Sequence, residues 1–422
     1  MADVTTIVGG GTPASKDDTN FAKPPAGIPW ITPADLSHFK DQYIRHGARN
    51  LSQKGFEVSS AKKMPAGTVL FSSRAPIGYV VIAMNQVTTS QGFKSFVLPA
   101  EICSKYVYQY LRHIKPLANQ MATGTTFKEL SGSSAALLPL LLPPLPEQTR
   151  IANKLDTLLG RVDRARERLD RVPEMLKRFR QAVLTAATSG VLTEGWRELS
   201  PNSWASSSLS SICIKVTDGE HISPQITTVG IPLVSAKDVR EWGVDFSDTK
   251  FVHDSFSIIS RKRCDPSKGD VLVVSRGATI GRTCLVTCDQ VFCLMGSVLL
   301  FRPNQDFVTP EFFALVLKSP SGLSQLTAAS GASAQSAIYI RDAKQLNVLL
   351  PTIPEQTEIV RQVEILFAYA DRLESRLKAA RKLSDNLSPA ILAKAFRGEL
   401  VAQDPNDEPA VELLKRIRAG RK

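Results

Sequence analysis

Leu145-Pro-Glu-Gln-Thr149 and its copy Ile353-Pro-Glu-Gln-Thr357, 208 positions further along, decide the fold of this chain. The same offset carries Gly190 onto Gly398 without a gap. A repeat has to be identified before local structure is assigned, because it fixes the architecture. Since the repeated unit is about half the chain, it indicates two domains that alternate with two connecting segments.

A second, looser repeat precedes each copy of that motif. Ile28-Pro29 returns as Ile231-Pro232, and Ser73-Arg-Ala-Pro-Ile-Gly78 returns as Ser275-Arg-Gly-Ala-Thr-Ile-Gly281. A short apolar run rich in β-formers stands before each Ser-Arg pair, and helical patterns occur elsewhere in both halves. The predicted fold class is therefore α+β, with two mixed α/β domains and an internal pseudo-two-fold repeat.

The two connecting segments have the period of coiled-coil helices. Their apolar residues alternate with spacings of four and three, which is a heptad a/d seam. The flanking positions are charged, and so narrow an apolar stripe suits a partner helix better than a broad core. The seam residues assigned to helix or partner binding are Ile151, Leu155, Leu158, Val162, Leu169 and Leu176, then Ile359, Val363, Leu366, Leu373, Leu377 and Leu387.

The two helices are expected to pair with each other. Each runs for about 40 residues, which at 1.5 Å per residue gives a length of roughly 60 Å. An antiparallel coiled coil is favoured over a parallel one, because the intervening domain then joins two neighbouring helix ends. Proline inside a helix costs roughly 3 kcal/mol, so we expect a kink or short break at Pro173. Ser388-Pro389 has the pattern that opens a fresh helix.

The repeat predicts a division of the chain into five segments. They are a first globular domain over 1–145, a helical spacer over 146–193, a linker and second domain over 194–351, a second spacer over 352–401, and a tail over 402–422 with a short helix from Pro409 to Ala419. The first domain lacks a counterpart of the Trp196–Ser208 lead-in. We expect the tail to fill that place.

Composition restricts the class of protein. The 43% hydrophobic and 22% charged content is that of a globular chain, and the net charge of +12 favours a polyanionic partner, either nucleic acid or an acidic membrane. No apolar run approaches the ~20 residues that cross a bilayer, and the start of the chain lacks the pattern of a secretory signal. Six cysteines in a chain of this length suggest a reducing compartment. We expect a cytoplasmic location and no membrane role.

Catalytic and metal-binding signatures are missing from the sequence. It contains no Gly-Lys dipeptide and hence no Walker A loop, and its five histidines are scattered. Cys264, Cys284, Cys288 and Cys293 could together hold zinc, but no Cys-x-x-Cys knuckle is present and core packing is favoured. The sequence therefore predicts no catalytic residue, no metal and no cofactor on this chain.

Loops in both domains combine Gly, Ser, Thr, Gln and Arg, which suits contact with DNA. Arginine can bind a guanine edge, glutamine an adenine edge, and backbone N–H groups a phosphate. Alternatively, Gly and Ser only shape turns and the arginines are solvated or ion-paired, so that the recurrence of Ser-Arg is structural. The candidate DNA-contacting residues are Thr12, Trp30, Ser73, Arg74, Gln91, Lys94, Thr123, Gly124 and Thr126, then Lys237, Ser275, Arg276, Thr279, Arg282, Ser333 and Gln335.

Several short motifs, spread over essentially the whole chain, have an order and a duplication typical of one family. They are Gly9-Gly-Gly-Thr-Pro13, Ile28-Pro-Trp-Ile-Thr-Pro33, Ser73-Arg-Ala-Pro-Ile-Gly78, Gln91-Gly-Phe-Lys94, the Pro-Pro-Leu-Pro-Glu-Gln run ending at Gln148, Ala393-Lys-Ala-Phe-Arg-Gly-Glu-Leu400 and Asp404-Pro-Asn-Asp-Glu-Pro409. With them the chain resembles the specificity (S) subunits of type I restriction-modification systems. It departs from that family in a truncated N-terminal lead and in Pro173.

The resemblance implies a function that composition alone does not indicate. The chain would be a non-catalytic subunit whose two target-recognition domains each read one half of a split double-stranded DNA site. Its helices would set the spacing between the halves and dock two modification subunits, which are adenine-N6 methyltransferases. Up to two restriction subunits would add ATP-driven cleavage. S-adenosylmethionine, ATP and Mg²⁺ are thus expected on the partner subunits.

Two other function classes remain open at this point. A coiled-coil interaction scaffold with protein-binding end domains would show no sequence-selective DNA binding, even with partners present. A stand-alone DNA enzyme would show metal- or cofactor-dependent activity in the purified chain. The missing catalytic motifs make the enzyme the least favoured of the three.

Overall fold

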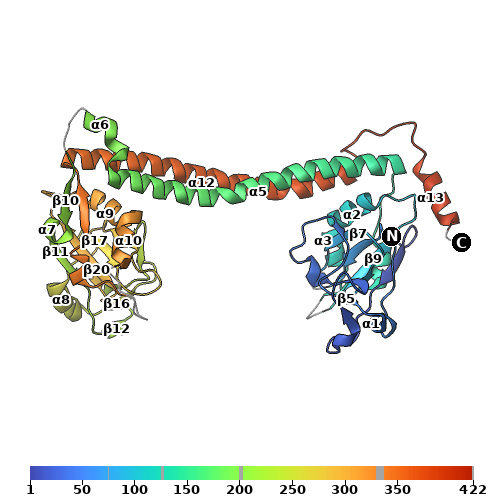
Figure 1. Ribbon diagram of the computed structural model, residues 1–422, viewed down its shortest axis with the longest axis horizontal. Helices are drawn as coiled ribbons and strands as arrows, with labels where there is room; N and C mark the ends of the chain where they lie inside the picture. The colour runs from blue at the N-terminus through green and yellow to red at the C-terminus, as the bar shows by residue number, and fades with distance from the viewer. Residues whose placement is uncertain (75, 125–127, 199–202, 329–336, 421–422) are drawn as a thin grey trace. The chain divides into compact units, whose positions relative to one another are not determined.

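The computed structural model describes residues 1–74, 76–124, 128–198, 203–328 and 337–420, which fall into two compact units. Unit 1 comprises Met1–Leu169 and Ala379–Lys422, and unit 2 comprises Asp170–Lys378. The long helices α5 (Leu145–Ser189) and α12 (Ile353–Phe396) each contribute one part to unit 1 and the other part to unit 2 (Figure 1). Both units contain helices and sheets, which confirms the mixed α and β content predicted from the sequence.

Unit 1 is built on two sheets. The first has the order β1 (Thr6–Gly9), β9 (Phe93–Val97), β6 (Val69–Ser72), β7 (Val80–Ala83) and β4 (Tyr43–Ile44). The second has the order β2 (Phe21–Ala22), β5 (Asn50–Leu51), β3 (Ile28–Ile31) and β8 (Thr88–Thr89). Its shorter helices are α1 (Gln53–Glu57), α2 (Ser104–His113), α3 (Lys115–Gln120), α4 (Gly132–Ala136) and α13 (Ala410–Ala419), with 3-10 turns at Asp18–Asn20 and Pro33–Leu36.

Unit 2 has a corresponding pair of sheets. The first has the order β11 (Cys213–Asp218), β20 (Val298–Pro303), β17 (Val271–Val274) and β18 (Thr283–Leu285). The second has the order β12 (Ile226–Thr227), β16 (Lys250–Val252), β13 (Ile231–Val234) and β19 (Cys293–Leu294). Two further pairs are β10 (Ala205–Ser208) with β21 (Asn347–Leu350) and β14 (Val239–Arg240) with β15 (Gly243–Val244).

The shorter helices of unit 2 lie between these strands in the chain. They are α6 (Glu194–Glu198), α7 (Leu209–Ile212), α8 (Asp254–Arg263), α9 (Pro310–Lys318), α10 (Pro320–Ala328) and α11 (Ile340–Ala343), with a 3-10 turn at Val191–Thr193. The α9 helix inserts Phe312 and Phe313 into the core that β17 and β20 also line.

The looser sequence repeat corresponds to a shared topology. The series β1-β9-β6-β7 and the series β11-β20-β17-β18 are both antiparallel throughout. In both second sheets the first three strands are antiparallel, and only the last strand, β8 or β19, joins in parallel. The Ser-Arg pairs follow β6 and β17, which are equivalent strands.

The fold-deciding motif ties each globular part to the start of its long helix. The buried amide of Gln148 accepts a hydrogen bond from Cys103 N at 2.9 Å and donates to Pro143 O at 2.9 Å. The buried Gln356 accepts from Thr309 N at 2.8 Å and donates to Pro351 O at 3.0 Å. Cys103 and Thr309 are the N-cap residues of α2 and α9, so the repeated glutamine holds equivalent helix ends in both units.

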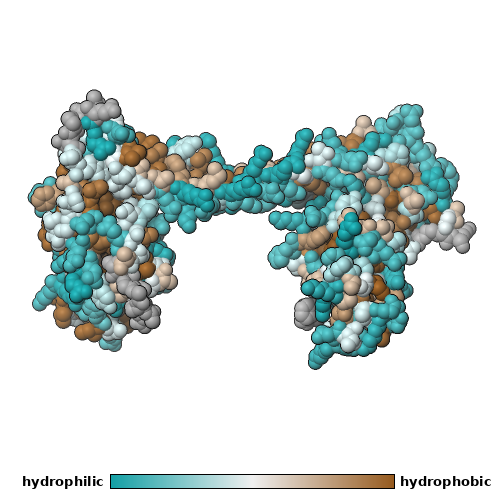
Figure 2. Space-filling view, in the orientation of Figure 1, coloured by the Kyte–Doolittle hydropathy of each residue, from teal (hydrophilic) through white to brown (hydrophobic). Residues whose placement is uncertain are grey.

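The two long helices contact each other within each unit. In unit 1, Arg166 Nη2 donates to Ser384 O at 2.9 Å, and Arg381 Nη2 donates to Leu169 O at 3.3 Å. Residue numbers therefore rise along one helix as they fall along the other. In unit 2, Arg180 pairs with Asp371 at 2.7 Å. The visible surface of both helices is largely hydrophilic (Figure 2), and no helix among the described residues is long and apolar enough to span a membrane.

The heptad assignment of buried positions needs correction at one place, Leu387. Leu158 is half-buried, and its neighbour Leu159 is buried because the start of α5 packs on the globular core of unit 1. Leu387 is 40% exposed, because α12 turns Leu392 and Phe396 toward that core. The other assigned positions are buried (Ile151, Leu155, Val162, Leu176, Ile359, Val363 and Leu377) or half-buried (Leu169, Leu366 and Leu373).

The predicted break at Pro173 does not occur, since α5 continues without interruption from Leu145 to Ser189, and a kink at this residue stays a prediction. Proline lacks the N–H that would bond to the carbonyl four residues earlier, which is that of Leu169. The guanidinium of Arg381 donates to this carbonyl from the opposing helix. The α12 helix also runs through Pro389, so no fresh helix opens there.

The C-terminal tail packs on the first globular part. Leu413 and Ile417 of α13 are buried in the core of unit 1. Arg418 pairs with Asp3 at 3.2 Å, and Arg150 pairs with Asp407 at 2.5 Å. The tail is therefore an integral part of unit 1.

Candidate nucleic-acid interface

In unit 1 the Ser-Arg motif lies where three chain segments meet. Ser73 N donates to Gly92 O at 2.8 Å, and Ser73 O accepts from Leu130 N at 2.9 Å. Ser73 is fully buried, whereas the next residue, Arg74, forms an isolated β-bridge with Glu129. Burial of the serine fixes the backbone from which Arg74 projects.

Unit 2 repeats this arrangement. Ser275 N donates to Ser297 O at 2.9 Å, and Ser275 O accepts from Ile338 N at 2.9 Å. Ser275 is buried, and Arg276 forms the isolated β-bridge, here with Ala337. Arg74 and Arg276 therefore occupy the same place in the two folds, which the sequence repeat alone did not establish.

The glycine that closes each motif is required by the turn. Gly78 N donates to Ser72 O at 3.0 Å, and Gly281 N donates to Val274 O at 2.8 Å. Both glycines have a left-handed backbone, with φ of 97° and 82°. Other residues rarely adopt this conformation, which explains the recurrence of glycine at this position.

Two of the predicted DNA-contacting side chains of unit 1, those of Arg74 and Lys94, lie beside one carboxylate, that of Glu129. Arg74 Nη1 lies 3.7 Å from Glu129 Oε2, and Lys94 Nζ lies 3.5 Å from Glu129 Oε1. Thr123 pairs with Glu129 through two backbone hydrogen bonds of 3.1 and 2.8 Å, and it is exposed. The structure thus joins the loops at Arg74, Lys94 and Thr123 into one surface.

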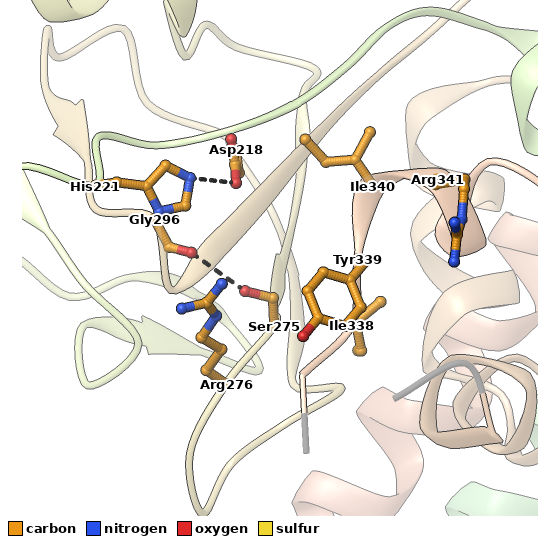
Figure 3. Close-up of a pocket in the computed structure, with 9 residues that line it drawn as sticks. All are labelled: Asp218, His221, Ser275, Arg276, Gly296, Ile338, Tyr339, Ile340 and Arg341. Atoms are coloured by element: carbon orange, nitrogen blue, oxygen red, sulfur yellow. Dashed lines mark hydrogen bonds and ion pairs between the residues drawn. The ribbon is translucent and has the colours of Figure 1, made fainter. Parts of the chain in front are cut away.

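The equivalent surface of unit 2 is a cavity of about 550 Å³ (Figure 3). Its lining residues come from the end of β11, the Ser-Arg motif, the start of β20 and α11: Asp218, His221, Ser275, Arg276, Gly296, Ile338, Tyr339, Ile340 and Arg341. Figure 3 shows His221, Arg276 and Tyr339 entering this space from three separate segments. These side chains offer a cation, an aromatic ring and an imidazole to one ligand.

Polar partners orient some of these groups and leave others free. His221 Nε2 lies 2.8 Å from Asp218 Oδ2, and Asp218 also pairs with Arg263. Arg276 is exposed, and its guanidinium has no hydrogen bond or ion pair with any described residue. An unpaired arginine at the mouth of a cavity is suited to bind an anion or a guanine edge.

Three predicted residues of unit 2 have structural partners instead. Lys237 pairs with Asp248 at 2.7 Å, and this hydrogen bond raises the pKa of Lys237. Arg282 Nη1 donates to Val239 O at 3.3 Å, and Thr279 O accepts from Arg282 N. These contacts stabilise the β14–β15 hairpin and the turn after Arg276.

The remaining predictions for unit 1 divide into exposed and buried residues. Thr12 and Gln91 are both exposed, and Gln91 N donates to Thr12 Oγ1 at 3.4 Å. Gly124 is exposed, with a φ of 120°. Trp30 is corrected to a core residue, because it is 3% exposed and its indole N–H donates to Gly11 O at 3.0 Å.

The hydroxyls of Ser73 and Ser275 are buried, so these serines shape the site and do not present a side chain to a ligand. Thr126, Ser333 and Gln335 lie outside the described residues.

Sequence reasoning missed Glu129, His221, Tyr339 and Arg341. The gapless offset of 208 aligns Glu129 with Ala337, so a comparison of the two halves could have found this difference. His221 follows β11 and Tyr339 precedes α11, and neither has a recurring motif. His221 and Tyr339 lie near Arg276 only in the folded structure, where all three line the same cavity.

The cysteines pack in an apolar cluster, which confirms core packing. Cys264 and Cys284 are buried beside Cys288, and Cys293 is buried in a neighbouring cluster. Burial raises the pKa of Cys264 and of Cys284 to about 12, so these thiols stay protonated. Among the residues that the structure describes, no His, Cys, Asp or Glu group is arranged to hold a metal ion.

Comparison with known proteins places these features in context. A family model described as a type I restriction modification DNA specificity domain matches residues 1–174 and 202–380. The EcoKI specificity subunit of Escherichia coli K12 is 32% identical and spans 94% of this chain and 92% of that protein. The EcoBI specificity subunit of Escherichia coli is 35% identical and spans 75% of this chain and 72% of that protein.

Solved structures show the same fold. An HsdS subunit from Thermoanaerobacter tengcongensis matches with a TM-score of 0.61 at 18% identity, over 94% of this chain and 95% of that one. A chain from a type I restriction-modification system matches with a TM-score of 0.65 at 19% identity, over 94% of this chain and 96% of that one.

Proposed function

Because the chain belongs to the family of type I restriction-modification specificity subunits, we propose that each of its two globular parts reads one half of a split double-stranded DNA site. The observation that carries this proposal is the equivalent placement of Arg74 and Arg276. Each follows a buried serine at a junction of three segments, and each is accessible. Because the surrounding side chains differ, the two half-sites should differ in sequence.

The proposed division follows the repeat. The target-recognition domains are 1–145 and 194–351, the helical spacers are 146–193 and 352–401, and the tail is 402–422. We further propose that the spacers form an antiparallel coiled coil about a pseudo-two-fold axis. The contacts of Arg166 with Ser384 and of Arg180 with Asp371 support this pairing. The paired helices would set the distance between the half-sites.

Recognition of the DNA site would combine contacts with phosphates and contacts with base edges. Basic side chains bind phosphates and give an affinity that falls with salt, with a logarithmic slope of about −0.9 per phosphate neutralised. The net charge of +12 suits this role. Arg276 and Arg74 would contact base edges in the major groove, where a bidentate arginine recognises guanine. Tyr339 and His221 would complete the second surface.

Catalysis would belong to partner subunits. Two modification subunits that use S-adenosylmethionine would dock along the helices, and up to two restriction subunits would bring ATP- and Mg²⁺-dependent cleavage. The chain would supply recognition and geometry only. Family membership disfavours a scaffold without DNA recognition.

A map of DNA methylation tests the proposed function. The chain and its methyltransferase partner, expressed in a methylation-free host, should methylate adenine in one split motif on both strands. The methylation should vanish when this chain is omitted, and replacement of residues 1–145 should alter one half of the motif only. Unmethylated DNA, with the methyltransferase intact and bound to this chain, would refute the proposal.

A further inference from the structure

Two pairs of equivalent positions differ in charge between the two units. Glu129 and Ala337 each form the isolated β-bridge with the arginine of the Ser-Arg motif. Lys94 and Leu299 are also equivalent, since they pair with the third residues of β6 and β17, Phe71 and Val273. Unit 1 therefore carries a carboxylate and a lysine where unit 2 carries two apolar side chains.

The carboxylate of Glu129 is accessible and only partly engaged. The side chains of Glu129, Arg74 and Lys94 are 41%, 35% and 15% exposed. The distances of 3.7 and 3.5 Å to the two cations exceed normal hydrogen-bond length, so the cations hold the carboxylate electrostatically. Two carboxylate oxygens offer about four acceptor sites, which leaves capacity for a ligand.

A carboxylate at this place restricts what the surface can contact. It repels the phosphate backbone, so its presence beside Arg74 would weaken DNA binding unless it meets a donor. The donors in the major groove are the exocyclic amino groups, N4 of cytosine and N6 of adenine. The neighbouring Arg74 can at the same time donate to guanine, which has only acceptors on that edge.

Building on the proposed function, we infer that Glu129 is a specificity-determining residue of the first half-site, whose carboxylate accepts a hydrogen bond from the amino group of a cytosine or an adenine. Lys94 and Arg74 position that carboxylate through their charges. Ala337 cannot make this contact, so the second half-site is read without a carboxylate at the equivalent position.

The variant Glu129→Gln in the complex with the methyltransferase partner tests this inference. It preserves side-chain size and removes the charge. Methylation mapping and competition between DNA duplexes should show a change in discrimination of about 5- to 150-fold at one base pair of the first half-site, because a glutamine amide also donates and therefore favours an adenine edge. A loss of preference for cytosine identifies cytosine as the ligand, and a stronger preference for adenine identifies adenine. The second half-site should be unchanged.

The matched control is Glu412→Gln, which removes the same charge from unit 1 at the exposed pair of Glu412 with Lys415 on α13. It should leave both half-sites as they are. If Glu129→Gln changes affinity for all DNA sequences equally, with the motif unaltered, Glu129 is only a counter-ion and the inference is wrong. A wild-type complex without any split motif would instead overturn the proposed function.

A second variant, Glu129→Asp, tests the inference if the Glu129→Gln chain does not assemble with the methyltransferase partner. Glu129→Asp keeps the charge and withdraws the carboxylate by one methylene. Reduced discrimination at a single base pair of the first half-site would support the inference. Full discrimination in an assembled Glu129→Asp complex would overturn it.

Discussion

Replacement of Phe396 by alanine should lower the free energy of unfolding of unit 1 by about 3–5 kcal/mol, as for other buried aromatic residues. Phe396 is buried at the end of α12. Its ring centroid lies 5.5 Å from that of Tyr106, 5.0 Å from Tyr110 and 5.2 Å from His113. The side chain therefore attaches the end of the long helix to α2, and its loss leaves a cavity between them.

Amide hydrogen exchange measures this effect region by region, which suits a chain of two units. Protection should fall in residues 1–169 and 379–422 and remain in 170–378. Leu387→Ala is the matched control, because Leu387 is apolar, lies on the same helix and is 40% exposed. It should cost less than about 1 kcal/mol. Equal losses in the two variants would contradict the packing described for Phe396.

Replacement of Arg302 by alanine should destabilise unit 2 by about 3–5 kcal/mol, because it leaves a buried carboxylate without its cation. Asp270 is 1% exposed. Arg302 Nε donates to Asp270 Oδ1 at 2.8 Å and Arg302 Nη2 to Asp270 Oδ2 at 2.8 Å, and the first of these bonds raises the pKa of Arg302. In the variant only Ser267 still donates to Asp270.

Chemical denaturation followed by a probe in unit 2 checks this expectation. Arg361→Ala is the control, because Arg361 pairs with Glu358 at an exposed site and such pairs are worth at most about 1 kcal/mol. The double variant Arg302→Met, Asp270→Leu should recover much of the lost stability, since it removes the unpaired charge. No recovery would show that Arg302 acts through packing and not through its charge.

The architecture was predictable because its sequence pattern occurs twice in the chain. The heptad spacing after each Pro-Glu-Gln-Thr motif predicted two long helices, and the looser repeat before each motif predicted two similar mixed α/β domains. The function of the motif was not predictable, because the partners of Gln148 and Gln356 lie 45 and 47 residues away along the chain. The sequence shows that the glutamine recurs, but only its tertiary hydrogen bonds show that it holds the start of α2 or α9.

The errors have the same physical origin. A heptad pattern describes a helix that packs only on another helix, so it misassigned Leu387, where the globular core of unit 1 determines burial. The continuation of α5 through Pro173 was not expected, because the donor to the carbonyl that proline leaves unpaired, Arg381, lies on the opposing helix. Trp30 was assigned to DNA contact although it is a core residue, and Glu129 was not among the candidate residues.

The most direct test of the account is a comparison of methylation maps for Arg74→Ala and Arg276→Ala in complexes with the methyltransferase partner. Each loss of a bidentate base contact costs about 1–3 kcal/mol of discrimination. Arg74→Ala should relax only one half of the split motif and Arg276→Ala only the other. If either variant changed both halves, or if neither changed the motif, the equivalent arginines would not be the readers of the two half-sites.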